Sequence, residues 1–243
     1  MKIDINCDVG EGVVNEHLLF PFISSCNIAC GGHFGDKNSI DKTIQLAVDN
    51  NVKIGAHPSF PDVKNFGRKV MYISDEVLKI SIENQMNLFQ ERLLNFNQKM
   101  HHIKPHGALY NLIAKEKKEA EKFIEIIKKY TNNCFLYVPY NSEIEKIALK
   151  NNIRIKYEFF ADRNYNDDLS LVSRAQKNAI IEKPEDVFKH IFNVLKNGKV
   201  LTISGNEKII QADTFCVHGD HVNSVEILQF INNVLKDKNI KIV

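Results

Sequence analysis

The sequence has no long apolar run and no marked excess of charge of either sign. None of its hydrophobic stretches approaches the roughly 20 residues that a membrane-spanning helix needs, and the start, Met1-Lys2-Ile3-Asp4, has no signal-peptide pattern. The formal net charge is +2, and the lysines are scattered, as in residues 115–129, rather than gathered with aromatic residues into a basic patch. We therefore expect a cytoplasmic protein that binds neither a membrane nor nucleic acid.

Cysteine is scarce and odd in number, which argues against a disulfide framework. The five cysteines lie in or beside predicted strands: Cys7, Cys26, Cys30, Cys134 and Cys216. Cys26 and Cys30 have a separation found in some metal sites, but an even spacing on a strand simply places both side chains on one face. We interpret them as small packing groups, with metal binding as the alternative.

The chain also lacks an internal repeat, a low-complexity tract and a Pro/Ser-rich linker. With 243 residues and 44% hydrophobic content it can bury one substantial core, so we predict a single domain over 1–243. No GxxxxGK[ST] run is present, so the sequence does not indicate where a nucleotide would bind.

Short apolar runs alternate with segments of helical periodicity along the chain, which predicts an α/β protein built of parallel β/α units. The predicted strands are 3–9, 22–29, 52–56, 100–104, 134–138, 153–160 and 215–217, and the predicted helices are 39–50, 75–97, 117–130, 142–151, 184–197 and 222–236. Ser74 and Pro184 are suited to begin two of these helices. Residues 199–210 predict a small hairpin outside the main sheet.

Six of the seven predicted strands end in a short polar motif. Among these motifs are Asp4-Ile5-Asn6-Cys7-Asp8, Gly55-Ala56-His57-Pro58, Lys104-Pro105-His106-Gly107 and Cys216-Val217-His218-Gly219-Asp220. Polar groups at the same end of successive parallel strands are typical of a β/α barrel, whose active site lies at the carboxyl rim of its strands. The sequence therefore predicts a seven-stranded parallel barrel with one shared site.

Strand parity predicts which side chains face the barrel interior, because successive side chains point to opposite sides. Asp4, Asn6 and Asp8 share one face, as do His102, Lys104 and His106. Since buried ions are costly unless paired or hydrated, we expect a solvated, ion-paired mouth.

Several of these polar groups also have a structural alternative. Asp4 and Glu158 could simply pair with Lys156 or another cation. Arg68, in the loop after the third strand, could clamp a substrate carboxylate or could pair with Asp62.

Seven strings of the sequence closely resemble the LamB/YcsF family. They are DINCDVGEG (4–12), NIACGGHFGD (27–36), GAHPSFPD (55–62), FGRK (66–69), KPHGALYN (104–111), FADRNY (160–165) and CVHGD (216–220). The resemblance spans almost the whole chain in the right order, and it implies a TIM-like barrel of the glycoside hydrolase/deacetylase type. The sequence departs from the family pattern at Gly32-His33-Phe34, at Lys69 and at Ser173, which concerns loop shapes and not the polar strand ends.

The resemblance implies a hydrolase of a cyclic amide, the A subunit of an ATP-dependent 5-oxoprolinase, which opens the lactam of 5-oxo-L-proline to L-glutamate. Such a site needs a base for water, stabilisation of the oxyanion and a clamp for the carboxylate. We assign Asp8 or Asp162 as the base, Lys104 with His106 as electrostatic stabilisers or proton donor, and Arg68 or Arg163 as the clamp. The remaining predicted binding residues are Asn6, Asn27, His33, His57, His218 and Asp220; we assign no metal ligand.

The resemblance further implies ATP, with Mg²⁺, as cofactor and subunits B and C as partners. Two alternatives remain open. One is a metal-dependent deacetylase or amidohydrolase, in which Asp8, His33, His57 and His106 bind a divalent ion that activates water. The other is a non-catalytic subunit that only binds 5-oxoproline or docks its partners.

Overall fold

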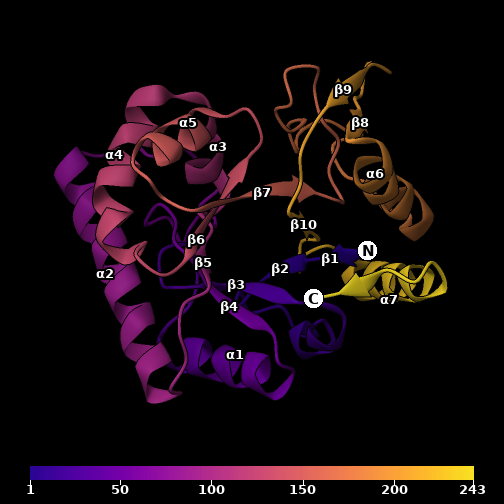
Figure 1. Cartoon of the computed structure of the whole chain (residues 1–243). Helices are drawn as coiled ribbons and strands as arrows, with labels where there is room; N and C mark the ends of the chain where they lie inside the picture. The colour runs from indigo at the N-terminus through magenta and orange to yellow at the C-terminus, as the bar shows by residue number, and fades with distance from the viewer.

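The computed structural model describes all residues from 1 to 243, and its centre is a closed barrel of seven strands (Figure 1). The strands neighbour one another in chain order, and the last closes onto the first. They are β2 (Ile5–Val9), β3 (Ser25–Ala29), β4 (Lys53–His57), β5 (His102–Ile103), β6 (Phe135–Pro139), β7 (Ile155–Phe160) and β10 (Thr214–Cys216). The predicted seven-stranded α/β barrel is confirmed.

Strand pairing in the barrel is parallel throughout. Strand β10 completes the ring between β7 and β2, with Phe215 opposite both Phe159 and Ile5. Because all seven strands run in the same direction, their carboxyl ends meet at one rim. The polar motifs that follow the strands are thereby brought together.

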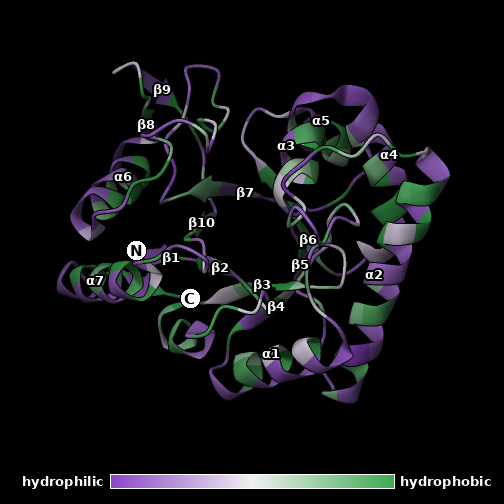
Figure 2. Ribbon diagram, turned by 180° about the vertical axis from the view of Figure 1, so that it is seen from behind, coloured by the Kyte–Doolittle hydropathy of each residue, from purple (hydrophilic) through white to green (hydrophobic).

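Helices cover the outside of the barrel and carry both hydrophobic and hydrophilic residues along their ribbons (Figures 1 and 2). They are α1 (Lys37–Asp49), α2 (Asp75–Asn95), α3 (Gly107–Lys115), α4 (Lys117–Ile127), α5 (Glu143–Lys150), α6 (Pro184–Asn197) and α7 (Ser224–Asp237). The Ser74 hydroxyl accepts a hydrogen bond from the Val77 backbone N–H at the start of α2, and Pro184 is the first residue of α6. Both predicted helix starts are therefore confirmed.

The hydrophobic core lies between the barrel and these helices. Outward-facing strand residues such as Ile5, Cys7 and Val9 are fully buried in it. All five cysteines are buried free thiols, and Cys26 and Cys30 both belong to this core. Their position agrees with the interpretation of the pair as packing groups.

The structure differs from the sequence prediction at three places. Helix α3 follows shortly after β5, where we had predicted only a polar motif. The first residue of this helix, Gly107, packs so closely that an added Cβ would lie 2.7 Å from the Gly67 carbonyl oxygen. Strand β3 begins at Ser25, because a 3₁₀ turn occupies Phe20–Phe22. The first predicted strand is split, and only its part from Ile5 belongs to the barrel.

Two small sheets lie outside the barrel. Strand β1 (Lys2–Ile3) pairs in parallel with β11 (Lys241–Ile242), which places the two chain ends side by side (Figure 1). Strands β8 (Lys199–Leu201) and β9 (Glu207–Ile209) pair antiparallel as a hairpin, where the sequence predicted one. No helix has both the length and the apolar character required to cross a membrane.

Candidate functional site

The barrel interior is polar, as strand parity predicted. Asn6 and Asp8 of β2 point inward, and so do Lys104, which follows β5, and Cys216 of β10. These side chains are at most 5% exposed, so they are buried more deeply than the solvated mouth that we expected. Ion pairs and hydrogen bonds, rather than open solvent, therefore compensate their charges.

Lys104 is the central cation of this interior. Its ammonium lies 2.7 Å from Asp8 Oδ1, 2.9 Å from Glu158 Oε1 and 3.1 Å from the Cys216 sulfur. The Glu158 contact is an ion pair in which neither carboxylate oxygen accepts a well-aligned hydrogen bond. We expected Glu158 to pair with Lys156 or another cation, and the structure shows that this cation is Lys104.

The charges of this centre stabilise one another against burial. Burial by itself lowers the pKa of Lys104, but Asp8, Cys216 and Glu158 outweigh it and hold that pKa well above its ordinary value. Burial likewise raises the pKa of Asp8, whereas His57 and Lys104 hold it well below its usual range. A charged Lys104 beside an ionised Asp8 is the state that this arrangement favours.

Two asparagines form a hydrogen-bonded chain that reaches Asp8 inside the barrel. Asn27 Nδ2 donates to Asp8 Oδ1 at 2.8 Å and to Asn6 Oδ1 at 2.8 Å, and Asn6 Nδ2 donates to the Thr214 hydroxyl. Both asparagines are fully buried. We had predicted both as substrate-binding groups. In the structure Asn27, which lies opposite Asp8 in the strand pairing, orients the Asp8 carboxylate directly, and Asn6 contacts Asn27 and Thr214.

A cluster of three histidines and one glutamate lies next to Asp8. His57 Nε2 is 3.4 Å from Asp8 Oδ2 and 2.9 Å from His106 Nδ1, and His33 Nε2 is 2.9 Å from Glu11 Oε1. Burial, aided by the neighbouring His57, lowers the pKa of His33 to about 2 and holds that of His106 well below its ordinary value. Both imidazoles are therefore neutral, and we call these four residues the Glu11 cluster.

Glu11 is the functional candidate that the sequence analysis missed. It follows β2 between Gly10 and Gly12, whose φ angles of 73° and 78° turn the chain back over the barrel mouth. Burial and the nearby Asp8 raise the pKa of its carboxyl well above the usual value. The sequence did contain a signal for Glu11 as a site residue, because an acid stands between two glycines directly after a polar strand end.

Two groups of side chains are close enough to hold a metal ion. One is the Glu11 cluster, and the other consists of Asp8, Cys216 and His218; within each group the potential ligand atoms lie within 4.8 Å of one another. The alternative that we drew from the sequence combined Asp8 with the three histidines. In the structure Glu11 joins the histidines.

The opposite side of the mouth contains Asp162 and His218. Asp162 accepts a hydrogen bond from the His218 backbone N–H at 2.9 Å and lies 2.8 Å from its ring Nδ1. Burial raises the pKa of Asp162, but the contacts with His218 outweigh it and lower the value to about 2. Both groups line a cavity of about 130 Å³ together with Arg163, Arg174 and Asp220.

The two arginines proposed as clamps have different partners. Arg163 is buried and donates to the backbone carbonyls of Val172, at 2.6 Å, and Ala179, at 3.2 Å, so part of its guanidinium fastens the following loop. Arg68 pairs with Asp220 across the mouth. The alternative pairing of Arg68 with Asp62 is wrong, because Arg68 pairs with Asp220 instead. Asp62 accepts hydrogen bonds from Asn65.

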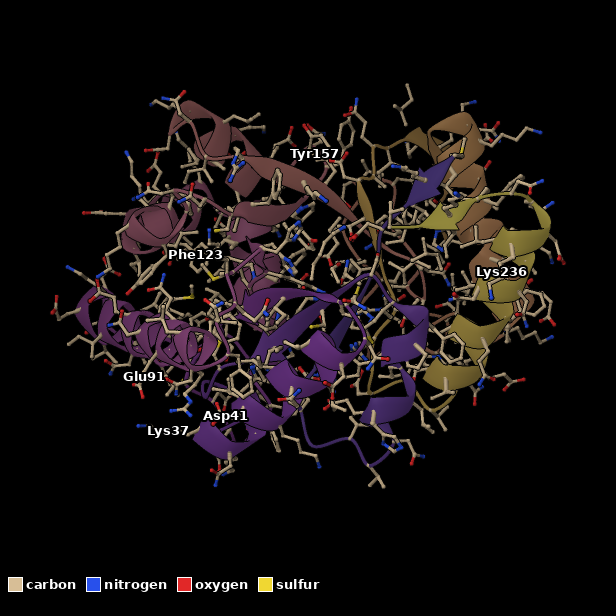
Figure 3. The ribbon with its side chains drawn as sticks, turned by 60° about the horizontal axis from the view of Figure 1, so that its bottom comes forward. Lys37, Asp41, Glu91, Phe123, Tyr157 and Lys236 are labelled. Atoms are coloured by element: carbon tan, nitrogen blue, oxygen red, sulfur yellow. The ribbon has the colours of Figure 1, made fainter.

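A larger hollow, of about 390 Å³, lies at the other end of the barrel. It is lined by Ser24 and Lys53, which stand at the amino ends of β3 and β4, and by Lys236 of α7, labelled in Figure 3. In β/α barrels this end serves stability, whereas chemistry takes place at the carboxyl rim. We therefore place the candidate site at the rim, in spite of its smaller cavity.

The chain matches known proteins along its whole length. It is 36% identical over 248 residues to the 5-oxoprolinase A subunit of Pyrococcus abyssi, with 100% of this chain and 97% of that protein covered, and 37% identical over 246 residues to the one of Bacillus cereus, with 99% and 97% covered. The crystal structure of the lactam utilization protein from Thermus thermophilus matches with a TM-score of 0.91 at 30% identity, covering 100% of this chain and 99% of that one. The LamB/YcsF family pattern matches residues 3–243. The chain belongs to the LamB/YcsF family.

Proposed function

We propose that this chain is the A subunit of an ATP-dependent 5-oxoprolinase, which hydrolyses the lactam of 5-oxo-L-proline to L-glutamate. The observation that carries the proposal is the match, over nearly the full length of both chains, to proteins named as the A subunit of 5-oxoprolinase. The buried polar rim supports it, because amide hydrolysis needs a fixed cation and a base at one place.

The rim residues divide naturally into roles for this reaction. Lys104 is a cation in a water-poor interior, where its charge stabilises a developing oxyanion far better than in water. Asp8 or Asp162 accepts the proton of the attacking water, and His106 acts with Lys104 as an electrostatic stabiliser. Arg68 or Arg163 binds the substrate carboxylate. Of the two, Arg163 lines the 130 Å³ cavity.

ATP and two further subunits belong to the same proposal. A lactam carbonyl is a poor electrophile, and transfer of the γ-phosphoryl group from ATP to the amide oxygen, with release of ADP, converts that oxygen into a leaving group. Water then adds to the carbon, and the ring C–N bond breaks to leave an acyl phosphate. A second water hydrolyses this acyl phosphate to glutamate and inorganic phosphate. Because the sequence has no GxxxxGK[ST] run, we assign the binding of ATP with Mg²⁺ to the assembled enzyme with subunits B and C.

Reconstitution tests this proposal directly. The chain is co-purified with candidate B and C subunits, and glutamate release from 5-oxo-L-proline is measured with and without ATP. We expect turnover only for the complex with ATP, and none for the isolated chain. Full turnover by the isolated chain would contradict the three-subunit assignment, and an inert complex would contradict the proposed reaction.

Asp8→Asn and His106→Gln complexes provide the second arm of this experiment. Both replacements nearly preserve side-chain size, so assembly can be verified by size-exclusion chromatography. We expect each to lower kcat by about 10²-fold or more. Near-normal turnover by both would favour the non-catalytic binding subunit.

A further inference from the structure

The ring nitrogens of two histidines in the Glu11 cluster face each other at 2.9 Å, His57 Nε2 and His106 Nδ1. His57 Nδ1 lies 2.7 Å from the Lys104 carbonyl oxygen, and His106 Nε2 lies 2.9 Å from the Phe66 carbonyl oxygen. A carbonyl oxygen only accepts hydrogen bonds, so each of these nitrogens carries the ring proton. A ring that carries only this proton presents a lone pair at its other nitrogen, which is Nε2 in His57 and Nδ1 in His106.

These two lone pairs converge with a carboxylate. His57 Nε2 and His106 Nδ1 are 2.9 Å apart, and Glu11 Oε1 lies 3.9 Å from the first and 3.5 Å from the second. All three side chains are at most 7% exposed. These three atoms face one another in a buried site, where one proton can bridge only one pair of them and a cation can bind all three.

His33 has a different role in the cluster. Its ring is stacked on that of His106, with centroids 3.7 Å apart and planes inclined by 6°, so one ion cannot lie in the plane of both rings. Its Nε2 instead contacts Glu11 Oε1 at 2.9 Å, while the Ser59 hydroxyl lies 3.0 Å from its Nδ1. His33 thereby orients the Glu11 carboxylate.

The backbone is shaped to fix the ring of His106. Phe66 and Gly67 both adopt positive φ angles, 54° and 61°, and this turn aims the Phe66 carbonyl at His106 Nε2. A Cβ on Gly67 would come within 2.9 Å of the His106 ring and 3.0 Å of the His33 Cβ. A non-glycine residue at positive φ costs about 1–3 kcal/mol, and such strain is common at functional sites.

We propose that Glu11, His57 and His106 bind a divalent first-row transition-metal ion. Two histidines and one carboxylate are a ligand set that holds Zn²⁺ or Fe²⁺ while leaving coordination positions open. Zn–N bonds of about 2.0–2.1 Å imply tetrahedral ligand atoms about 3.3 Å apart, and the three separations here, 2.9, 3.5 and 3.9 Å, bracket that value.

The surroundings of the ligands match such a site. Each histidine donates its other ring N–H to a backbone carbonyl, the arrangement that fixes the tautomer of metal-binding imidazoles. Asp8 Oδ2 lies 3.4 Å from His57 Nε2, so its carboxylate is next to the ion and can accept a hydrogen bond from a water bound there. The site thus adjoins the Asp8–Lys104 pair.

Metal titration of the isolated full-length chain tests the proposal. After treatment with a chelator, the protein is titrated with Zn²⁺ by calorimetry and with Co²⁺ by visible absorption. We expect one ion per chain, a Co²⁺ ligand-field spectrum and a rise in Tm with Zn²⁺. In Glu11→Gln and His106→Asn, affinity should fall at least tenfold and the spectrum should be lost.

His17→Gln is the matched control, because His17 is a histidine outside the cluster, and it should bind as the wild type does. Circular dichroism verifies the fold of each variant. A wild-type chain that binds no ion at one equivalent overturns the proposal, as does equal binding by folded Glu11→Gln and the wild type. Since neither substrate nor partner subunit is used, this outcome is independent of the lactam-hydrolysis assay.

Discussion

Asp4 and Asp8 flank the start and end of the same inward face and are both 5% exposed, but their partners differ in kind. Asp4 accepts hydrogen bonds from the hydroxyls of Ser24, Ser25 and Thr214, at 3.0, 2.8 and 2.6 Å. Asp8 instead contacts Lys104, Asn27 and His57. One carboxylate is satisfied by neutral hydroxyls, and the other lies among groups that carry or exchange protons.

The difference distinguishes a structural aspartate, Asp4, from a candidate catalytic one, Asp8, on the same inward face. Hydroxyl donors fix a carboxylate without offering a proton-transfer partner, and the one cation near Asp4, Lys53, is 38% exposed at the amino end of the barrel. Asp4 therefore ties β2, β3 and β10 together. Asp8 shares Lys104 with Glu158 at the rim, where a charge that develops on a substrate can be stabilised.

Removing Lys104 should have the largest effect, because it breaks the buried centre on which Asp8 depends. Lys104→Met leaves Asp8 and Glu158 as buried carboxylates without their cation. We expect the free energy of unfolding to fall by about 3–5 kcal/mol, measured by urea denaturation at pH 7. A loss below about 1 kcal/mol would show that water, and not Lys104, compensates these charges.

Asp8→Asn should affect activity far more than stability. The amide retains the shape of the carboxylate and can still contact Asn27, but it cannot accept a proton from water. We expect kcat of the assembled enzyme to fall by about 10²- to 10⁴-fold. The unfolding transition of the isolated chain serves as the check on folding.

Asp4→Asn should give the opposite result. Its carboxylate receives three hydroxyl donors, and an amide cannot accept all three, so we expect a loss of about 1–3 kcal/mol in unfolding free energy. The kcat of the folded fraction should stay near that of the wild type. A kcat loss as large as that of Asp8→Asn would remove the distinction between the two aspartates.

The sequence predicted the barrel and its inward face because strand periodicity and parity are local properties. The inward placement of Asp8, Lys104 and Cys216 followed from spacing alone. The partner of each charge did not, because pairing depends on the register between strands. For Glu158 and Asp4 the sequence left the partner open, as Lys156 or another cation, and the structure shows Lys104 beside Glu158 and Lys53 beside Asp4.

The Glu11 cluster was only half predictable, for a related reason. Three of its members are histidines at strand ends, and histidine beside glycine or proline was a visible signal. Glu11 joins these histidines because the two flanking glycines, which have positive φ angles, turn its loop back over the barrel mouth. Backbone turns of this kind are encoded by glycine, but their direction is set by packing that a single sequence does not display.

Asp162 extends the comparison to a third buried aspartate, whose partner is a histidine. Its pKa is about 2, against about 3.9 for an unfolded chain, so its ionised form stabilises the fold by about 2–3 kcal/mol. Because the folded pKa is depressed, this contribution is present above about pH 4 and is lost as the pH falls toward 2. The stability difference between wild type and Asp162→Asn should shrink over that interval, and a constant difference would contradict the assignment.

Breaking an exposed ion pair should have the smallest effect on the unfolding free energy. It tests the premise that the contacts of the aspartates are strong because they are buried. Lys37 of α1 and Glu91 of α2 lie near each other on the outer surface of the two helices (Figure 3), with Nζ 3.6 Å from Oε1 and exposures of 63% and 55%. Solvent and salt screen such a pair, so Lys37→Ala should change the unfolding free energy by about 0–1 kcal/mol, and less in high salt. A loss comparable to that of Lys104→Met would mean that charge pairing stabilises this protein irrespective of burial, and the contrast between Asp4 and Asp8 would then need another cause.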